Sequence, residues 1–350
     1  GWLWGGLKVP CSNRICARMR VLRTPASAFA DVEAAGWLWG EPQFFTSKLF
    51  QAEVRIAYWD LGPKSASETI LLTHGEPSWS FLSRRLIGPL LTKGYRVVLF
   101  DQVGFGWSDK PADESDYTYE RHVAWNEDLL CNCLDLTSIT AVFQDWGGLL
   151  GLRAAARSPH RFSRLLLSNT VLPAGEPASE GFYSWKQFVK GGGLDGPGKI
   201  GKMLGRAARG PSCGPSKALS PQEEAAYEAP FPDTTYKAGA RAFPELVPTP
   251  ESDPTGRPQG AGIEVNRAMW RVFEGWTKPV LLAFSDGDPV LGGLGDVWRE
   301  KCPGCKGQRH VTLSGGVGHF SQDGGGDQLV QVLIRFVEET PLAGRGTSKL

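Results

Sequence analysis

The sequence lacks a long apolar segment, a marked excess of either charge, and a second Cys-x-x-Cys pair. No hydrophobic run approaches the roughly 20 residues that a membrane-spanning helix needs, so we expect no membrane span. The net charge of +1 offers no attraction to nucleic acid. At 350 residues, 41% of them hydrophobic, the chain can bury a large core. We therefore expect a globular, monomeric and cytoplasmic protein that acts on a small uncharged molecule.

The seven cysteines do not predict a metal centre. Cys302 and Cys305 have the spacing of a metal knuckle or a redox pair. A structural zinc needs four ligands, and the nearest histidine, His310, adds only a third. An odd number of cysteines in a long chain is typical of free thiols in a reducing compartment. We expect neither metal nor cofactor.

The two ends of the chain are predicted to lie outside the fold. The first thirty residues contain arginines but no Asp or Glu, which is typical of a targeting segment, although an extension upstream of a start at Met19 explains it equally well. We expect residues 1–18 to be such an extension and residues 341–350 to be a tail.

Short apolar runs alternate with longer helical ones from about residue 51 onward. This alternation predicts an α/β fold with a mostly parallel, doubly wound sheet. The expected strands are 53–60, 69–73, 95–100, 139–143, 164–169, 280–284 and 310–313. The expected helices include 80–93, 121–136 and 327–339.

The alternation is interrupted between residues 172 and 260, where glycines, prolines and basic residues separate short helical pieces. We interpret this segment as an inserted helical cap, and its basic residues as a solvated surface rather than a site for an anionic partner. The core of the fold is then formed by residues 19–171 and 261–340.

The segment Gln144-Asp145-Trp146-Gly147-Gly148 follows a predicted strand and precedes a predicted helix. A sharp strand-to-helix turn of this kind presents a nucleophile in α/β-hydrolases. The usual pattern has glycine two places before the nucleophile, where this chain has Phe143. Taken alone, Asp145 could simply cap the helix.

Two later loops supply the partners that a nucleophile needs. His319 follows the last predicted strand in Gly315-Gly316-Val317-Gly318-His319, and Asp288 follows the strand before it. The resulting order of nucleophile, acid and histidine is that of α/β-hydrolases, with Asp288 orienting His319 and His319 acting as base. Asp286 is the rival for the acid, and we prefer Asp288 because it lies further past its strand.

Two backbone N–H groups are candidates for an oxyanion hole. Glu76 follows a strand in His74-Gly75-Glu76-Pro77, where the glycine lets the backbone approach a ligand closely. The second expected donor is the N–H of Trp146, directly after Asp145.

A carboxylate nucleophile can displace a leaving group from a saturated carbon and form an ester that water then hydrolyses. Alkyl halides and epoxides are the substrates that suit this chemistry. A halide needs only hydrogen-bond donors, and the indoles of Trp146 and the cap residue Trp185 can provide them. An epoxide oxygen needs an acidic donor, for which Tyr183, Tyr227 and Tyr236 are the candidates.

These motifs closely resemble those of the haloalkane dehalogenases, in particular the subfamily with one halide-binding tryptophan beside the nucleophile and one in the cap. The similarity extends from about Arg23 to Glu339. It includes His74-Gly75-Glu76-Pro77, Gly104-Phe105-Gly106, Gln144-Asp145-Trp146-Gly147-Gly148, Phe182 with Trp185, Ala229-Pro230-Phe231-Pro232-Asp233-Thr234, Asp288 and Gly318-His319-Phe320.

The resemblance implies that Asp145, His319 and Asp288 form the catalytic triad, and that Trp146 and Trp185 hold the halide. It also implies an apolar pocket around the substrate, formed by Leu149, Phe182, Phe231, Pro232, Val290 and Leu291. Leu149 stands where an aromatic residue is expected, which affects pocket size. The partners would be a small halogenated aliphatic substrate, water and halide. The alternatives are an epoxide hydrolase with the same triad and a non-catalytic relative that binds a ligand.

Overall fold

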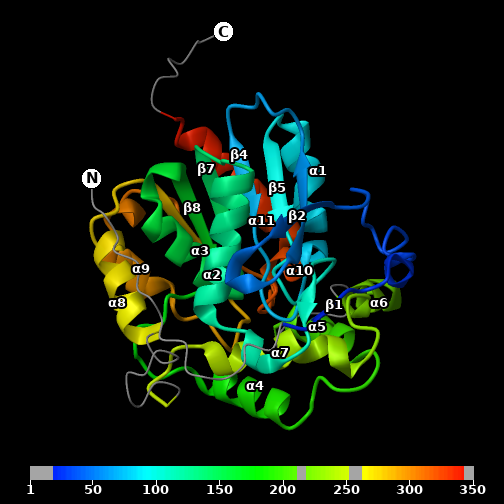
Figure 1. Ribbon diagram of the computed structural model, residues 1–350. Coiled ribbons are helices and arrows are strands. Elements are labelled where there is room, and N and C mark those ends of the chain that lie inside the picture. The colour runs from blue at the N-terminus through cyan, green and yellow to red at the C-terminus, as the bar shows by residue number, and fades with distance from the viewer. Residues whose placement is uncertain (1–18, 211–217, 252–261, 343–350) are drawn as a thin grey trace.

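The computed structural model describes residues 19–210, 218–251 and 262–342, and its centre is an eight-stranded sheet (Figure 1). The strand order is β10-β9-β8-β7-β4-β5-β3-β2. The strands are β2 (Gln43–Ser47), β3 (Val54–Leu61), β4 (Thr69–Leu72), β5 (Arg96–Phe100), β7 (Ile139–Gln144), β8 (Phe162–Ser168), β9 (Val280–Ser285) and β10 (Val311–Leu313). The strands β1 (Val21–Leu22) and β6 (Lys110–Pro111) form a separate antiparallel pair.

The six strands from β10 to β5 are mutually parallel, which confirms the predicted fold class. The strand β3 is also expected from its apolar residues, but it runs antiparallel to β5 and to β2. The edge strand β2 is not among the predicted strands, because only one of its five residues, Ser47, is buried and the segment carries little apolar alternation.

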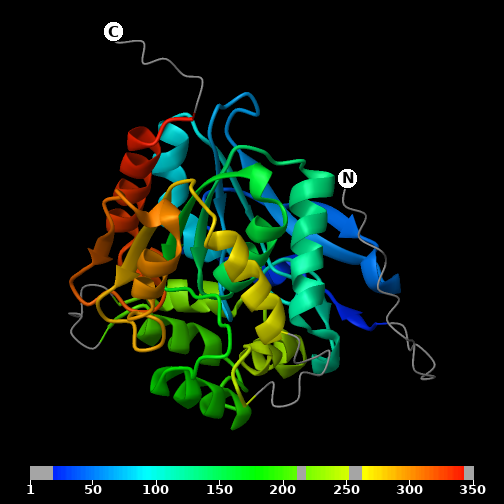
Figure 2. The ribbon, with the colours of Figure 1, turned by 90° about the vertical axis from the view of Figure 1, so that its left-hand side faces the viewer.

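Helices cover both faces of the sheet. The helices α1 (Arg84–Thr92) and α11 (Gly326–Glu339) contact each other on one face, while α2 (Tyr119–Glu127), α3 (Asp145–Arg157) and α8 (Gly262–Phe273) cover the other (Figure 2). Successive strand residues serve the two layers alternately. In β4, Ile70 and Leu72 belong to one buried cluster and Leu71 to the other, as the alternation of side chains along a strand requires.

Two predicted helices differ in detail from the structure. The segment predicted as a helix over 80–93 begins with a 3-10 turn, Ser80–Ser83, and becomes α-helical only at Arg84. The segment predicted over 121–136 begins earlier, at Tyr119, because Thr118 accepts a hydrogen bond from the N–H of Arg121 and caps the helix. It continues beyond Glu127 as a π-helical stretch, Asp128–Cys133.

Four of the described helices between β8 and β9 cover one end of the sheet, at the bottom of Figures 1 and 2. We call them the cap helices: α4 (Glu180–Lys190), α5 (Lys199–Ala207), α6 (Pro221–Glu228) and α7 (Ala238–Leu246). The short helix α10 (Ser321–Gly324) precedes α11, and α9 (Gly295–Lys301) follows β9. In the described part of the chain, no helix has the length and apolar character needed to cross a membrane.

A buried ionic cluster joins the cap helices to the body of the fold. Arg84 of α1 lies 2.6 Å from Asp323 of α10 and 2.5 Å from Glu223 of α6. Tyr227, also on α6, donates its hydroxyl hydrogen to Asp323. Arg84 and Asp323 are almost fully buried, so α6 is held to the core by charges that water barely reaches.

Candidate active site

Asp145 stands at a sharp bend between β7 and α3. Its φ of 48° lies in the left-handed region that few residues other than glycine adopt. Two hydrogen bonds hold the bend: the Asp145 N–H donates to the carbonyl of Asn169 at 2.9 Å, and the Thr170 hydroxyl donates to the carbonyl of Asp145 at 2.9 Å. A Cβ at Gly148 would lie only 1.9 Å from the Thr170 hydroxyl oxygen, so this glycine allows the helix to start so close to β8. Strain of this kind is typical of functional positions.

Phe143 occupies the position at which the usual elbow pattern has glycine, and the structure accommodates it. A Cβ at Gly151 would lie 2.3 Å from Phe143 Cε1, so the aromatic ring fills the space that Gly151 leaves open in the second turn of α3. The ring is fully buried. In this chain the small residue at the contact between β7 and α3 is therefore Gly151 on the helix, and the strand carries Phe143.

His319 lies between two carboxylates. Its Nδ1 atom is 2.9 Å from Asp288 Oδ2, and its Nε2 atom is 3.3 Å from Asp145 Oδ2. The rival acid, Asp286, instead accepts hydrogen bonds from the N–H groups of Gly315, Gly316 and Val317 at 3.0 to 3.1 Å. Asp286 thus holds the glycine turn before His319, and Asp288 is the carboxylate that contacts the ring.

The two carboxylates set the charge of the imidazole. Burial lowers the pKa of His319, but the charge of Asp288 and the hydrogen bonds with Asp145 and Asp288 outweigh it and raise this pKa to about 10. Burial likewise raises the pKa of Asp288, while His319 and the N–H groups of Val290 and Leu291 lower it below its usual value. The raised pKa favours the imidazolium form of the ring in the unreacted protein.

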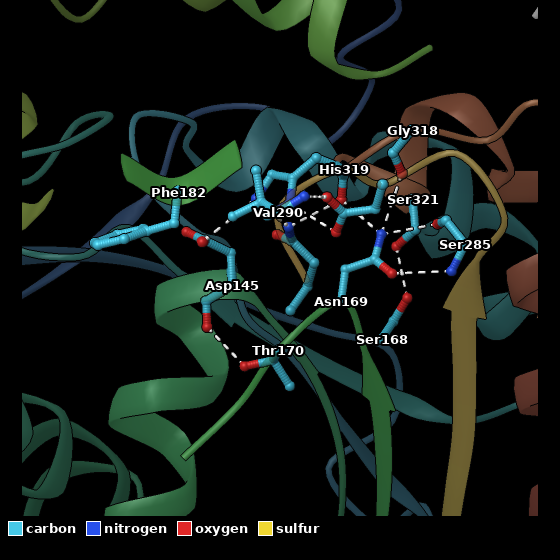
Figure 3. A network of polar contacts seen from close by, with 12 residues as sticks. Asp145, Ser168, Asn169, Thr170, Phe182, Ser285, Val290, Gly318, His319 and Ser321 are labelled. Atoms are coloured by element: carbon cyan, nitrogen blue, oxygen red, sulfur yellow. Dashed lines mark hydrogen bonds and ion pairs between the residues drawn. The ribbon is translucent and has the colours of Figure 1, made fainter. Parts of the chain in front are cut away.

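Asn169 follows β8 and anchors the loop that carries His319 (Figure 3). Its side-chain amide donates to the carbonyls of His319 at 2.9 Å and Gly318 at 3.1 Å, and to the hydroxyl of Ser285 at 2.8 Å. Its side-chain oxygen accepts from the Ser285 N–H at 2.9 Å. This role is not among those predicted from the sequence. The available signal was a polar Ser168-Asn169-Thr170 run at the carboxyl end of a buried strand.

The loop after β4 contacts Asp145 through its backbone. The N–H of Glu76 donates to Asp145 Oδ1 at 2.8 Å, and a Cβ at Gly75 would lie 2.2 Å from the same oxygen. His74 holds this loop in place, because its Nε2 accepts from the N–H of Gln102 at 2.9 Å. Asp145 Oδ1 is thus bound by the loop, and Oδ2 faces His319.

A cavity of about 600 Å³ opens above Asp145, between the carboxyl ends of the strands and the cap helices. Its polar lining comes from Glu76, Asp145, His319 and two arginines, Arg206 and Arg209. Most of the remaining wall is apolar: Pro77, Trp146, Leu149, Val171, Phe182, Trp185, Met203, Ala207, Pro244, Val247, Pro289, Val290, Leu291 and Phe320.

Comparison with known proteins shows the family of this chain. A family model described as the alpha/beta hydrolase fold matches residues 68–325. A haloalkane dehalogenase from Psychrobacter cryohalolentis is 41% identical over 92% of this chain and 100% of the relative. Another, from Mycolicibacterium paratuberculosis, is 38% identical over 90% of this chain and 98% of the relative. The chain belongs to the haloalkane dehalogenase family.

A solved structure agrees with this assignment. The tetrameric haloalkane dehalogenase DpaA from Paraglaciecola agarilytica is 29% identical to this chain and superposes with a TM-score of 0.78. The superposition covers 91% of this chain and 97% of that one. The family membership therefore extends over nearly the whole fold, including the region of the cap helices.

Most residues predicted to form the pocket of a haloalkane dehalogenase do line the cavity. These are Leu149, Phe182, Val290 and Leu291, together with the two tryptophans Trp146 and Trp185. Figure 3 shows Phe182 and Val290 close to Asp145 and His319. The N–H of Val290 also donates to Asp288 Oδ1 at 2.8 Å, so the wall of the cavity helps to orient the acid.

Phe231 and Pro232 are not part of the described cavity lining, contrary to the expectation from the sequence. Phe231 is buried against the edge of Phe105, with 6.4 Å between the ring centroids. The preceding residue, Pro230, accepts a hydrogen bond from the Thr24 hydroxyl at 2.7 Å. These contacts direct the segment toward the body of the fold and away from the cavity.

Cys302 and Cys305, whose spacing suits a metal knuckle, are buried free thiols. Within the described ranges, no three or more His, Cys, Asp or Glu side chains form a cluster suited to a metal ion. Cys302 contacts the carbonyl of Trp276 through its sulfur, away from the cavity lining.

Proposed function

We propose that this chain hydrolyses haloalkanes to an alcohol and a halide through a covalent ester on Asp145. The observation that carries this proposal is the position of the Asp145 carboxylate. It stands on a strained elbow beneath a largely apolar cavity, with Oδ1 bound by the Glu76 N–H at 2.8 Å and Oδ2 at 3.3 Å from His319 Nε2.

In the first step Asp145 Oδ2 attacks the carbon that carries the halogen. The new C–O bond forms as the carbon–halogen bond breaks, and the halide leaves with the bonding electron pair. We propose that the indole N–H groups of Trp146 and Trp185 bind the departing anion, since both side chains line the cavity and indole N–H groups can only donate. The apolar wall around them excludes water and strengthens these hydrogen bonds.

In the second step water attacks the ester carbon of Asp145, and His319 Nε2 takes the proton from that water. Negative charge develops on Oδ1, where the Glu76 N–H already donates, and we propose the Trp146 N–H as the second donor. When the intermediate collapses, the alkoxide leaves with the proton that His319 returns. The alcohol is released and Asp145 is left as a carboxylic acid. Its proton passes to His319 Nε2, which restores the Asp145 carboxylate and the imidazolium.

Formation of the ester also prepares the base. Because Asp145 contributes to the raised pKa of His319, converting this carboxylate to a neutral ester lowers that pKa. The imidazolium of the unreacted protein can then lose its proton and accept one from water. Asp288 orients the ring through its 2.9 Å contact with Nδ1.

The experiment that tests this function is halide release from a panel of short chloro- and bromoalkanes. We expect release by the unmodified chain and none by Asp145→Asn, which keeps the size of the side chain but removes the nucleophile. A folded protein that releases no halide across the panel would contradict the proposal and support a non-catalytic relative.

Epoxide hydrolysis is the weaker alternative, because none of the three cap tyrosines is among the described residues that line the cavity. Tyr227 is fully buried and binds Asp323, and the Tyr183 hydroxyl donates to Glu251 at 2.9 Å. Tyr236 is not a lining residue either. We therefore assign none of them to the opening of an epoxide.

We also propose a monomeric and cytoplasmic protein. The described cysteines Cys131, Cys133, Cys302 and Cys305 are all free, which suits a reducing compartment. Light scattering tests the oligomeric state, and a tetramer like that of the DpaA structure would contradict the monomer.

A further inference from the structure

The side chain of Glu76 has surroundings that the steps above leave unexplained. Only the main-chain N–H of Glu76 serves Asp145, whereas the side chain forms part of the cavity wall and is 5% exposed. Its Oε1 atom is buried and has no hydrogen-bond partner among the described residues. A buried polar atom without a partner is unfavourable, and because this one lies on the cavity wall, a group bound in the cavity can serve as its partner.

The groups around this carboxyl favour its neutral form. Burial and then the charge of Asp145 raise the pKa of Glu76 well above its usual range, while a hydrogen bond from the Trp185 side chain and the charge of His319 oppose this rise only in part. The other charged groups on the cavity wall are Arg206 and Arg209, near the end of α5. Asp288 contacts the His319 ring through Nδ1, on the other side from Asp145.

Trp185 and Glu76 line the same cavity, and the Trp185 side chain hydrogen-bonds the Glu76 carboxyl. An ionised Glu76 would be an acceptor only, would bind the Trp185 N–H and would place a negative charge where the halide must stand. A protonated Glu76 has an O–H donor of its own and competes less for the indole. Burial can keep a carboxylic acid neutral so that it serves as a donor.

We propose that Glu76 acts as a neutral acid that leaves the Trp185 N–H to the departing halide and donates its own O–H to the same anion. This rests on the proposed dehalogenation. No proton is transferred: the halide takes the electron pair of the carbon–halogen bond, and the proton stays on Glu76. The carboxyl thereby becomes a third donor beside Trp146 and Trp185, and the anion site is lost when Glu76 ionises.

The test is a titration of tryptophan fluorescence with chloride and bromide between pH 6 and 10, on the full chain. Glu76→Gln is neutral at every pH, keeps an N–H donor at the side chain and retains the main-chain N–H that serves Asp145. Glu76→Leu removes the side-chain donor. The same variants in a His319→Gln background remove the titration of the imidazole from the comparison.

In the unmodified chain we expect halide affinity to fall at least tenfold as the pH rises through the pKa of Glu76. We expect the affinity of Glu76→Gln to vary less than threefold over the same range. Glu76→Leu should bind chloride roughly tenfold more weakly at every pH, the effect of about one hydrogen bond. The affinity of Glu76→Leu for bromide should fall less than its affinity for chloride, because the charge of bromide is more diffuse.

The same pH profile in the unmodified chain and in Glu76→Gln would overturn this inference and leave the dehalogenation intact, provided that halide is released. The inference would also be overturned if Glu76→Leu bound chloride as tightly as the unmodified chain. If the unmodified chain showed no halide binding and no halide release, both the proposed function and this inference would be overturned.

Discussion

The side-chain amide of Asn169 donates to the backbone carbonyl of His319 at 2.9 Å, joining the end of β8 to the loop that carries the histidine. The same amide also donates to Gly318 and Ser285, so this buried residue helps to position His319, together with Gln144, whose side-chain amide donates to the same carbonyl at 3.2 Å. A side chain that contacts no substrate thus holds the proposed base in place.

Replacing Asn169 by alanine should therefore impair the action of His319 as base more than the action of Asp145 as nucleophile. We expect the loss of several buried hydrogen bonds to lower the free energy of unfolding by about 2 to 4 kcal/mol. Hydrolysis of the ester should slow more than its formation, which burst-phase measurements of halide release can separate. The control is Ser285→Ala, which removes only the hydroxyl partner, and an equal effect of the two variants would contradict this role.

Gly151→Ala should destabilise the fold because its methyl group would meet the ring of Phe143. The added Cβ would lie 2.3 Å from Cε1, so the ring or α3 must shift, and overpacking of this kind costs about 1 to 3 kcal/mol. Thermal unfolding of Gly151→Ala, Phe143→Leu and the double variant measures the coupling. Additive effects in this cycle would contradict the close contact of the two residues.

The raised pKa of His319 predicts a loss of stability at alkaline pH. Its folded-state pKa of about 10 lies above the ordinary value of 6.5, so its contribution is fully present below about pH 6.5 and is lost as the pH rises toward 10. The slope from this group is at most about 1.4 kcal/mol per pH unit. The contribution of His319 is the difference between the free energies of urea unfolding of the unmodified chain and of His319→Gln, measured at each pH. A pH-independent difference would contradict the charged imidazole.

Arg84→Met should destabilise the protein strongly, since it removes the cation closest to the buried Asp323 and leaves only Arg85, whose Nε lies 3.8 Å from the carboxylate. We expect a loss of about 3 to 5 kcal/mol in the free energy of unfolding. The matched control is Arg85→Met: Arg85 also contacts Glu223, at 2.8 Å, but its side chain is 42% exposed, so removing it should cost less than about 1 kcal/mol. Equal losses would show that burial does not determine the strength of this cluster.

Tyr227→Phe distinguishes the two chemistries. The tyrosine hydroxyl binds Asp323 in the buried cluster, and Tyr227 is not among the described residues that line the cavity. The variant should therefore lose stability but keep halide release within about threefold of the unmodified rate. Halide release and diol formation are measured on the same preparation. Diol formation that disappears in this variant would favour the epoxide alternative.

The sequence predicted the fold class and the positions of Asp145, Asp288 and His319 because parallel strands bring their carboxyl ends to one edge of the sheet. Each of these residues follows shortly after a strand whose apolar residues are easily recognised. The edge strand β2 and the antiparallel direction of β3 were not accessible in this way. The direction of β3 depends on its pairing with β5, which is distant in the sequence, and β2 is recognised as a strand only by its pairing with β3.

The role of Asn169 could not be predicted for a related reason. Its partners, His319 and Ser285, are more than a hundred residues away and meet it only in the folded chain. The positions of Phe231 and Pro232 depend in the same way on Thr24 and Phe105. Local patterns specify which residues are available for chemistry, and tertiary contacts decide which of them face the cavity.

The central claim is that Asp145 forms an ester with the substrate, and mass spectrometry of His319→Gln after incubation with a short bromoalkane tests it most directly. Without the base the ester should accumulate, so we predict a mass increase of one alkyl group less one hydrogen on the peptide that contains Asp145, with one halide released per chain. An unmodified Asp145 peptide, or the same mass increase on another residue, would contradict the mechanism.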